Sequence, residues 1–189
     1  DRYYFELNYP IGELAPYSLC AILLGVSYLV FNTLYQRAGP RMVIEYKLGS
    51  SQADIFRLAA GAAIAGIIFL ILFFLFIMAV YGSGYAESLF SKYAVSVNML
   101  LLVFSISIFN STGIFEGIFL SFDQEKKFMQ SSFFYLACLA ISLVVNFYYS
   151  LTLIEFLLIY LIIKVSHFIF IFLLFYLYLK DSNSHKVVI

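Results

Sequence analysis

Five long apolar stretches dominate this 189-residue sequence and restrict what it can fold into. A helix needs roughly 20 apolar residues to cross the ~30 Å hydrocarbon core of a bilayer. The stretches reach this length at residues 14–35, 58–81, 93–122, 128–149 and 152–179. Because backbone polar groups in lipid must be hydrogen-bonded within the protein, such stretches form helices. The sequence therefore predicts an all-α, polytopic membrane helix bundle that occupies residues 1–189 as a single unit.

The composition agrees with a lipid environment. Hydrophobic residues make up 63% of the chain and charged residues 12%, whereas soluble domains are about half apolar and a quarter charged. A soluble core of this length cannot bury so much apolar surface. Eleven basic residues balance eleven acidic ones, so no overall positive field predicts nucleic-acid binding.

Catalytic and metal-binding motifs are missing from the sequence. It contains no glycine-rich phosphate loop, no GxSxG and no HExxH. Cys20 and Cys138 lie within apolar runs and lack CxxC spacing, which is typical of small core residues and not of disulfides or zinc ligands. We therefore expect neither an enzyme nor a bound cofactor or metal.

The basic residues predict the direction of the spans. When the spans alternate, two basic residues outside the membrane, Arg2 and Lys92, fall on one side and eight on the other. Basic loops stay in the cytoplasm, so we expect a cytoplasmic C-terminus and a first span that runs inward. The eight residues are Arg37, Arg41, Lys47, Arg57, Lys126, Lys127, Lys180 and Lys186.

Two connecting segments carry further predictions. Gly39 and Pro40 predict the end of the first spanning helix, and the stretch SSQAD predicts an N-cap for the second.

The chain starts at Asp1 with a polar, aromatic segment. We interpret this segment as the end of a preceding helix, followed by a short loop, in a larger protein.

Lys164 is the one basic residue inside an apolar stretch. It lies ~18 Å along the helix from Thr152, too far for its stem to reach either surface easily. A lysine at this depth costs on the order of 3 kcal/mol on insertion scales. Tyr160, Lys164 and His167 share one helix face. This pattern predicts a structural ion pair with an acid on a neighbouring helix, a cationic site for an anionic substrate, or a proton relay.

The third stretch carries a polar stripe. Asn98, Ser105 and Thr112 recur every seven residues, and Glu116 follows one turn later. At about 100° per residue, Glu116 returns to the azimuth of Asn98 on a continuous helix. The stripe has two interpretations, which are hydrogen bonding between helices and the lining of a water-filled passage.

Shorter polar edges mark two other stretches. Asn32 in the first stretch lies in line with Ser18 and Gln36, and Asn146 in the fourth lies one turn from Ser142. The same two interpretations apply to them. Small residues spaced by four, as in Gly113 and Gly117, predict close helix packing.

Several short motifs follow one another along the chain. They are Asp1-Arg2, APYSLC at 15–20, Pro40, YGSGY at 81–85, DQEKK at 123–127 and Asn146. With these motifs the sequence resembles the C-terminal half of bacterial polysaccharide flippases, which move O-antigen and capsule repeat units. Those proteins belong to the superfamily of multidrug, oligosaccharidyl-lipid and polysaccharide exporters. The sequence departs from their pattern at Ala15, where glycine is usual, and after Asn146, where the usual proline and glycine are missing.

The resemblance implies half of a two-bundle, MATE-like transporter with five transmembrane helices and the end of a preceding one. It implies alternating access and translocation of undecaprenyl-pyrophosphate-linked oligosaccharide across the bacterial inner membrane. Arg2 and Lys164 fit the cationic cavity of such proteins. Membrane lipids and other polysaccharide-assembly proteins are the further partners that it implies.

Two alternative functions remain open at this point. One is a membrane polysaccharide polymerase of the same pathway, although the short predicted outer loops disfavour it. The other is a multidrug exporter of the same fold, although a central Lys164 would repel hydrophobic cations.

Overall fold

The computed structural model describes residues 11–82 and 96–185, and its regular structure is entirely helical. Five segments are long and apolar enough to cross a membrane, because two short helices together form one of them. The predicted polytopic all-α bundle is therefore confirmed. Arg2 and the predicted end of a preceding helix lie outside the described residues. The helices are α2 (Ile11–Lys47), α3 (Gln52–Gly82), α5 (Val97–Phe109), α6 (Thr112–Ser121), α7 (Glu125–Tyr149) and α8 (Leu153–His185).

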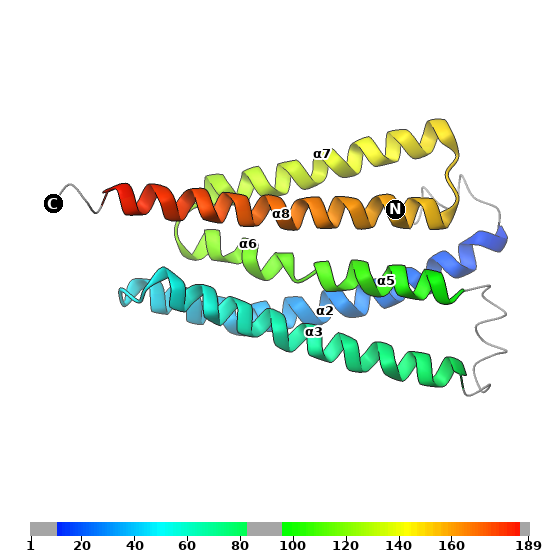
Figure 1. The fold of residues 1–189 in the computed structure, drawn as a ribbon, viewed down its shortest axis with the longest axis horizontal. Helices are drawn as coiled ribbons and strands as arrows, with labels where there is room; N and C mark the ends of the chain where they lie inside the picture. The colour runs from blue at the N-terminus through cyan, green and yellow to red at the C-terminus, as the bar shows by residue number, and fades with distance from the viewer. Residues whose placement is uncertain (1–10, 83–95, 186–189) are drawn as a thin grey trace.

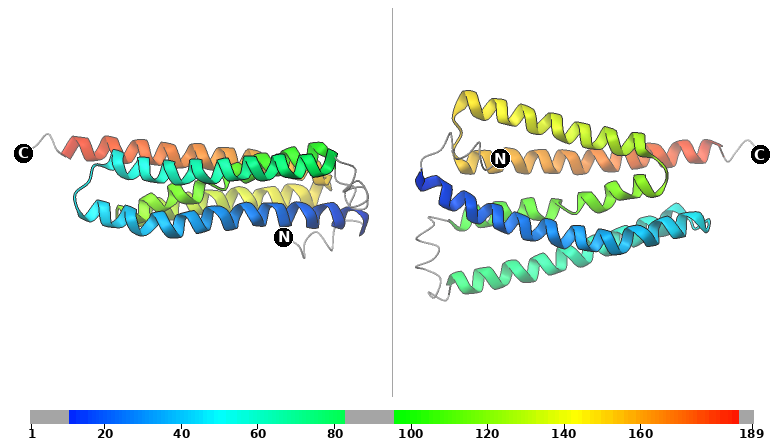
Figure 2. Two further views of the ribbon diagram at one scale, coloured as in Figure 1. Left: turned by 90° about the horizontal axis from the view of Figure 1, so that it is seen from below. Right: turned by 180° about the vertical axis from the view of Figure 1, so that it is seen from behind.

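The helices form three layers with the two short helices in the middle. Helices α7 and α8 lie side by side, α2 and α3 form the opposite layer, and α5 and α6 run between them (Figure 1). Helix α2 contacts α3, α5 and α6, while α8 contacts α5, α6 and α7. The view from behind in Figure 2 shows the same three layers. The α5–α6 segment thus joins the two outer layers.

The connections alternate between the two ends of the bundle. The α2–α3 turn, the α6–α7 turn and the C-terminal end of α8 lie at one end, which we call the basic end (Figure 1). The α7–α8 turn lies at the other. The basic end carries the described loop cations that the sequence places on one side, which are Arg37, Arg41, Lys47, Arg57, Lys126 and Lys127.

Helix α2 does not end at Pro40, so that prediction is wrong. It continues through Pro40 to Lys47 as a helix of 37 residues. A proline removes one backbone hydrogen bond, but here its neighbours hold the helix. Ala38 and Met42 are buried in the core, while Pro40 itself is exposed. Burial of this face offsets the lost bond, as tertiary packing often does in membrane helices.

Local sequence sets the starts of two helices. The Ser51 hydroxyl accepts a hydrogen bond from the Asp54 amide at 3.2 Å, so the predicted cap of the second span is confirmed. At the start of α8, the Glu155 carboxylate accepts from the Thr152 amide at 2.8 Å, and Thr152 Oγ1 accepts from the Glu155 amide at 3.4 Å. This reciprocal pair is a capping box.

The third span is broken, which corrects the assumption of one continuous helix. Helix α5 ends at Phe109 and α6 begins at Thr112. Across the break, the amides of Asn110 and Ser111 donate to carbonyls three residues earlier, and Thr112 Oγ1 donates to the Phe109 carbonyl at 2.5 Å. Polar side chains that bond to nearby backbone compete with regular helix geometry. The predicted alignment of Glu116 with Asn98 assumed one continuous helix, so it does not hold in this broken span.

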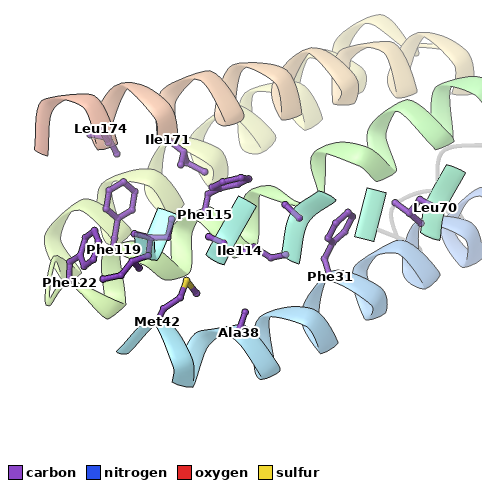
Figure 3. Close-up of a cluster of buried hydrophobic side chains, with 14 residues drawn as sticks. Phe31, Ala38, Met42, Leu70, Ile114, Phe115, Phe119, Phe122, Ile171 and Leu174 are labelled. Carbon is purple, nitrogen blue, oxygen red and sulfur yellow. The ribbon is translucent and has the colours of Figure 1, made fainter. Parts of the chain in front are cut away.

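The larger core cluster joins all three layers near the basic end. Met42 of α2, Ile55 of α3, Phe119 of α6 and Ile171 of α8 are almost completely buried there. Figure 3 shows the aromatic residues of α6 between the α2 side and the α8 side. Because side chains from four helices interdigitate here, this cluster fixes the position of α6 relative to both outer layers.

Candidate functional site

A group of polar and aromatic side chains meets where α6, α7 and α8 come together. Two of its members, Lys164 and His167, are buried charged or polar residues of the last span, with 9% and 4% of their surface exposed. Lys164 lies about 17 Å along α8 from Leu153, near the middle of the apolar segment Leu153–Tyr178. We call this group the polar cluster, and it consists of Glu116, Ser131, Tyr135, Tyr160, Lys164 and His167.

Three residues of the polar cluster form hydrogen bonds with one another. The Ser131 hydroxyl donates to Glu116 Oε1 at 2.7 Å, and His167 Nε2 lies 2.9 Å from Ser131 Oγ and 3.2 Å from Glu116 Oε1. The Glu116 side chain is 17% exposed. Each residue comes from a different helix, so this triad connects α6, α7 and α8 directly.

The hydrogen bonds define the tautomer of His167. Ser131 has one hydroxyl hydrogen, and it is donated to Glu116. His167 Nε2 must therefore carry a hydrogen in order to bond to Ser131 Oγ. The other ring nitrogen, Nδ1, is buried and has no hydrogen-bond partner among the described residues.

Lys164 lies in a different environment one turn away. Its ammonium is over the ring of Tyr135, 4.7 Å from the centroid, and 5.6 Å from the centroid of Tyr160. Among the described residues, no carboxylate lies within 4 Å of this nitrogen. The acid of the polar cluster is thus paired with His167, and the lysine rests on aromatic faces.

Tyr135 contacts three other members of the polar cluster. Its ring stacks on the His167 imidazole with centroids 4.9 Å apart, and its hydroxyl lies 3.0 Å from that of Tyr160. The same ring faces Lys164. Tyr160, Lys164 and His167 share one face of α8, as the sequence indicates, and Tyr135 of α7 covers that face.

The predicted stripe of the third span does not form one lining. Asn98 is exposed near the start of α5. Ser105 donates to the Leu101 carbonyl of its own helix at 2.8 Å. Thr112 is buried at the helix break, and Glu116 alone joins the polar cluster. Three of the four residues therefore lie outside the polar cluster.

The remaining predicted site residues lie elsewhere. Asn32 is half-buried on α2. Asn146 is buried at the end of α7, where its Oδ1 accepts a hydrogen bond from the Leu151 amide at 3.1 Å and supports the α7–α8 turn. Arg2 lies outside the described residues. None of the three is among the members of the polar cluster.

Sequence reasoning missed two residues of the site, Ser131 and Tyr135. Both lie on the face of α7 that also carries Ser142 and Asn146, since steps of three, four or seven residues connect positions 131, 135, 138, 142 and 146. Extending the short polar edge of the fourth span towards its N-terminus would have found them. The hydrogen bond from Asn110 to Ser27 at 2.7 Å was also missed, because no pattern links those positions.

Two cavities lined by described residues are small and mostly apolar. One of about 20 Å³ lies between α2, α3 and α5, where Ser107 is its polar residue, and another of about 10 Å³ is lined by Phe56, Phe115 and their neighbours. A cavity needs about 10–15 Å³ and several polar partners to hold one water molecule. A water-filled passage beside Lys164 therefore stays a prediction.

The fold and the polar cluster define a multi-pass α-helical membrane protein with a buried cation, a carboxylate and an imidazole at one three-helix contact. Such ionisable groups within a membrane bundle usually mark a functional site. Comparison of the chain with protein-family models, curated proteins and solved structures gives no match. The resemblance to polysaccharide flippases is therefore a prediction from sequence motifs.

Proposed function

We propose that this chain is part of a membrane transporter that moves an anionic lipid-linked substrate, with Lys164 as the residue that attracts the anion. The observation that supports the proposal is the buried ammonium near the middle of α8 without a carboxylate within 4 Å among the described residues. An ammonium at this depth is expensive, and a purely structural lysine would be expected to pair with an acid.

The electrostatics of a bilayer explain why a transporter of anions needs such a group. The attraction between opposite charges is much stronger in a low-dielectric interior than in water. A lysine without a carboxylate in direct contact offers this attraction to an incoming phosphate or pyrophosphate. Glu116 does not cancel it directly, because Ser131 and His167 hold that carboxylate.

The substrate class rests on the family resemblance. We infer that the substrate is an undecaprenyl-pyrophosphate-linked oligosaccharide and that the chain forms half of a MATE-like, two-bundle flippase. Alternating access would then turn the repeat unit across the bacterial inner membrane. The basic end of the bundle would face the cytoplasm, because positively charged loops are retained there, and the C-terminus would lie on that side.

The experiment that tests this function replaces Lys164 in the full-length protein. We expect Lys164→Ala to abolish export of repeat units in a strain that depends on this protein, while its level in the membrane stays unchanged. Lys164→Arg should retain part of the activity, because it keeps the charge. Lys127→Ala is the matched control, because it removes a cation that also lies over a tyrosine ring, that of Tyr178, but at the basic end. Normal export by Lys164→Ala would refute the proposal.

A further inference from the structure

We propose that Tyr135 and Tyr160 hold the Lys164 ammonium in place of a carboxylate, so that an anion can bind there without breaking an internal ion pair. This inference rests on the proposed role of Lys164 as an anion site and adds two residues to it. The ammonium lies 4.7 and 5.6 Å from the centroids of the two rings. Lys164 is 9% exposed and makes no hydrogen bond to a described residue.

A buried ammonium requires a compensating partner because it has left water. The face of an aromatic ring attracts a cation, and this attraction is larger where water is excluded. A ring face, unlike a carboxylate, carries no full negative charge. The three N–H donors of the lysine thus remain available to a ligand with several acceptor oxygens.

The rest of the polar cluster keeps its acid away from this cation. Glu116 receives hydrogen bonds from Ser131 and His167, which lie on α7 and α8. The ring of Tyr135 stacks on His167 and also faces Lys164. The hydrogen bond between Tyr135 and Tyr160 at 3.0 Å fixes the two rings relative to each other. The acid is therefore hydrogen-bonded to Ser131 and His167, while the ammonium lies against two ring faces without direct contact with a carboxylate of the described residues.

The first test measures the coupling between Tyr135 and Lys164 without any ligand. Tyr135→Leu is introduced into the wild-type protein and into Lys164→Met, and the thermal unfolding of all four proteins is followed in detergent. We expect Tyr135→Leu to lower the Tm clearly in the wild type and much less in the Lys164→Met background. Equal decreases in both backgrounds would overturn the proposal, because the ring would then act only through packing.

The second test places a carboxylate beside Lys164, where the wild-type protein has the ring of Tyr160. We expect Tyr160→Glu to pair with Lys164 and to weaken binding of inorganic pyrophosphate by about tenfold or more, measured as loss of the pyrophosphate-induced rise in Tm. Tyr160→Phe keeps the ring and should keep most of the binding. Tyr149→Glu, which adds an acid at the exposed end of α7, is the control.

The results distinguish this inference from the proposed function. Wild-type binding of pyrophosphate by Tyr160→Glu would overturn the role of the tyrosines and leave the anion site intact. If the wild type gives no response to pyrophosphate but Tyr135 and Lys164 are coupled, the holding role is supported and the anion site is contradicted. If pyrophosphate still raises the Tm of Lys164→Met, the anion site is also contradicted. The coupling between Tyr135 and Lys164 would then decide whether the rings hold the ammonium.

Discussion

Gly117 of α6 lies so close to Tyr35 of α2 that a Cβ atom at position 117 would overlap the tyrosine ring. Gly66 of α3 has the same relationship with Phe31 of α2. Glycine thus allows two helices to approach the same face of α2. By contrast, a Cβ at Gly113, one turn before Gly117, would meet nothing within 4 Å. The spacing of small residues predicted close packing, but only one glycine of that pair provides it.

Gly117→Ala should destabilise the bundle. The added methyl group has to displace the Tyr35 ring, and such overpacking typically costs about 1–3 kcal/mol. Gly113→Ala on the same helix is the control, and we expect it to leave the stability unchanged or slightly raised. Thermal unfolding in detergent measures both. Equal stabilities for the two variants would show that Tyr35 moves aside freely.

Ser131→Ala should weaken the contact of α6 with α7 and α8. It removes the hydroxyl that donates to Glu116 and accepts from His167, and an unsatisfied buried partner costs about 1–3 kcal/mol. Ser105→Ala provides the comparison, because that hydroxyl bonds only to its own helix among the described residues. The expected result is a lower denaturation midpoint for Ser131→Ala alone. If Ser105→Ala lowers it as much, the triad adds no stability of its own.

Asn110 and Ser27 should be energetically coupled. Their hydrogen bond at 2.7 Å ties the helix break to α2, and interhelical bonds of this type contribute about 0.6 kcal/mol on average in a membrane. The measurement is a double-mutant cycle with Asn110→Ala and Ser27→Ala. Additive effects of the two substitutions would contradict a direct contribution of this bond.

Single cysteines along the third span should differ in reactivity. We expect a water-soluble thiol reagent to label position 98 readily, position 105 less and position 112 least, because Asn98 is exposed near a helix end and Thr112 is buried. Labelling of intact membranes followed by a gel-shift assay gives the order. Rapid reaction at all three positions would instead favour the water-filled passage that the polar stripe predicts.

The two ends of the bundle should be accessible from opposite sides of the membrane. Leu48 in the α2–α3 turn is 75% exposed, and Tyr149 next to the α7–α8 turn is 76% exposed. We expect an impermeant thiol reagent added to whole spheroplasts to label Tyr149→Cys but not Leu48→Cys. Opened membranes should allow both to react. The reverse labelling would invert the proposed orientation.

The apolar stretches alone predict the class of fold, because each is long enough to span a bilayer and lipid leaves helices as the available structure. Local chemistry also predicts the cap at Ser51. Pro40 shows the limit of such reasoning. The cost of a proline is local, but the burial of Ala38 and Met42 that offsets it depends on residues far away in the sequence.

The candidate site shows the same limit. The face of Tyr160, Lys164 and His167 is a property of one helix, and helical periodicity predicts it correctly. The partners of that face depend on how α6 and α7 pack against α8, which no single helix encodes. The helix break also placed Glu116 beside His167, away from the azimuth of Asn98. Only three-dimensional contacts show that the imidazole and not the lysine pairs with the acid.

The unbroken course of α2 through Pro40 has a practical consequence for imaging this molecule. At 37 residues, α2 measures about 55 Å, well beyond the ~30 Å thickness of the hydrocarbon layer. The turn that joins its end to α3 contains Gly49, a glycine in the left-handed region with φ +80°, next to the exposed Leu48. A folded marker protein fused into this turn through both of its ends would be attached to two helices that pack in the core of the bundle. It would add mass and a visible direction to a small particle, which helps alignment in electron cryomicroscopy.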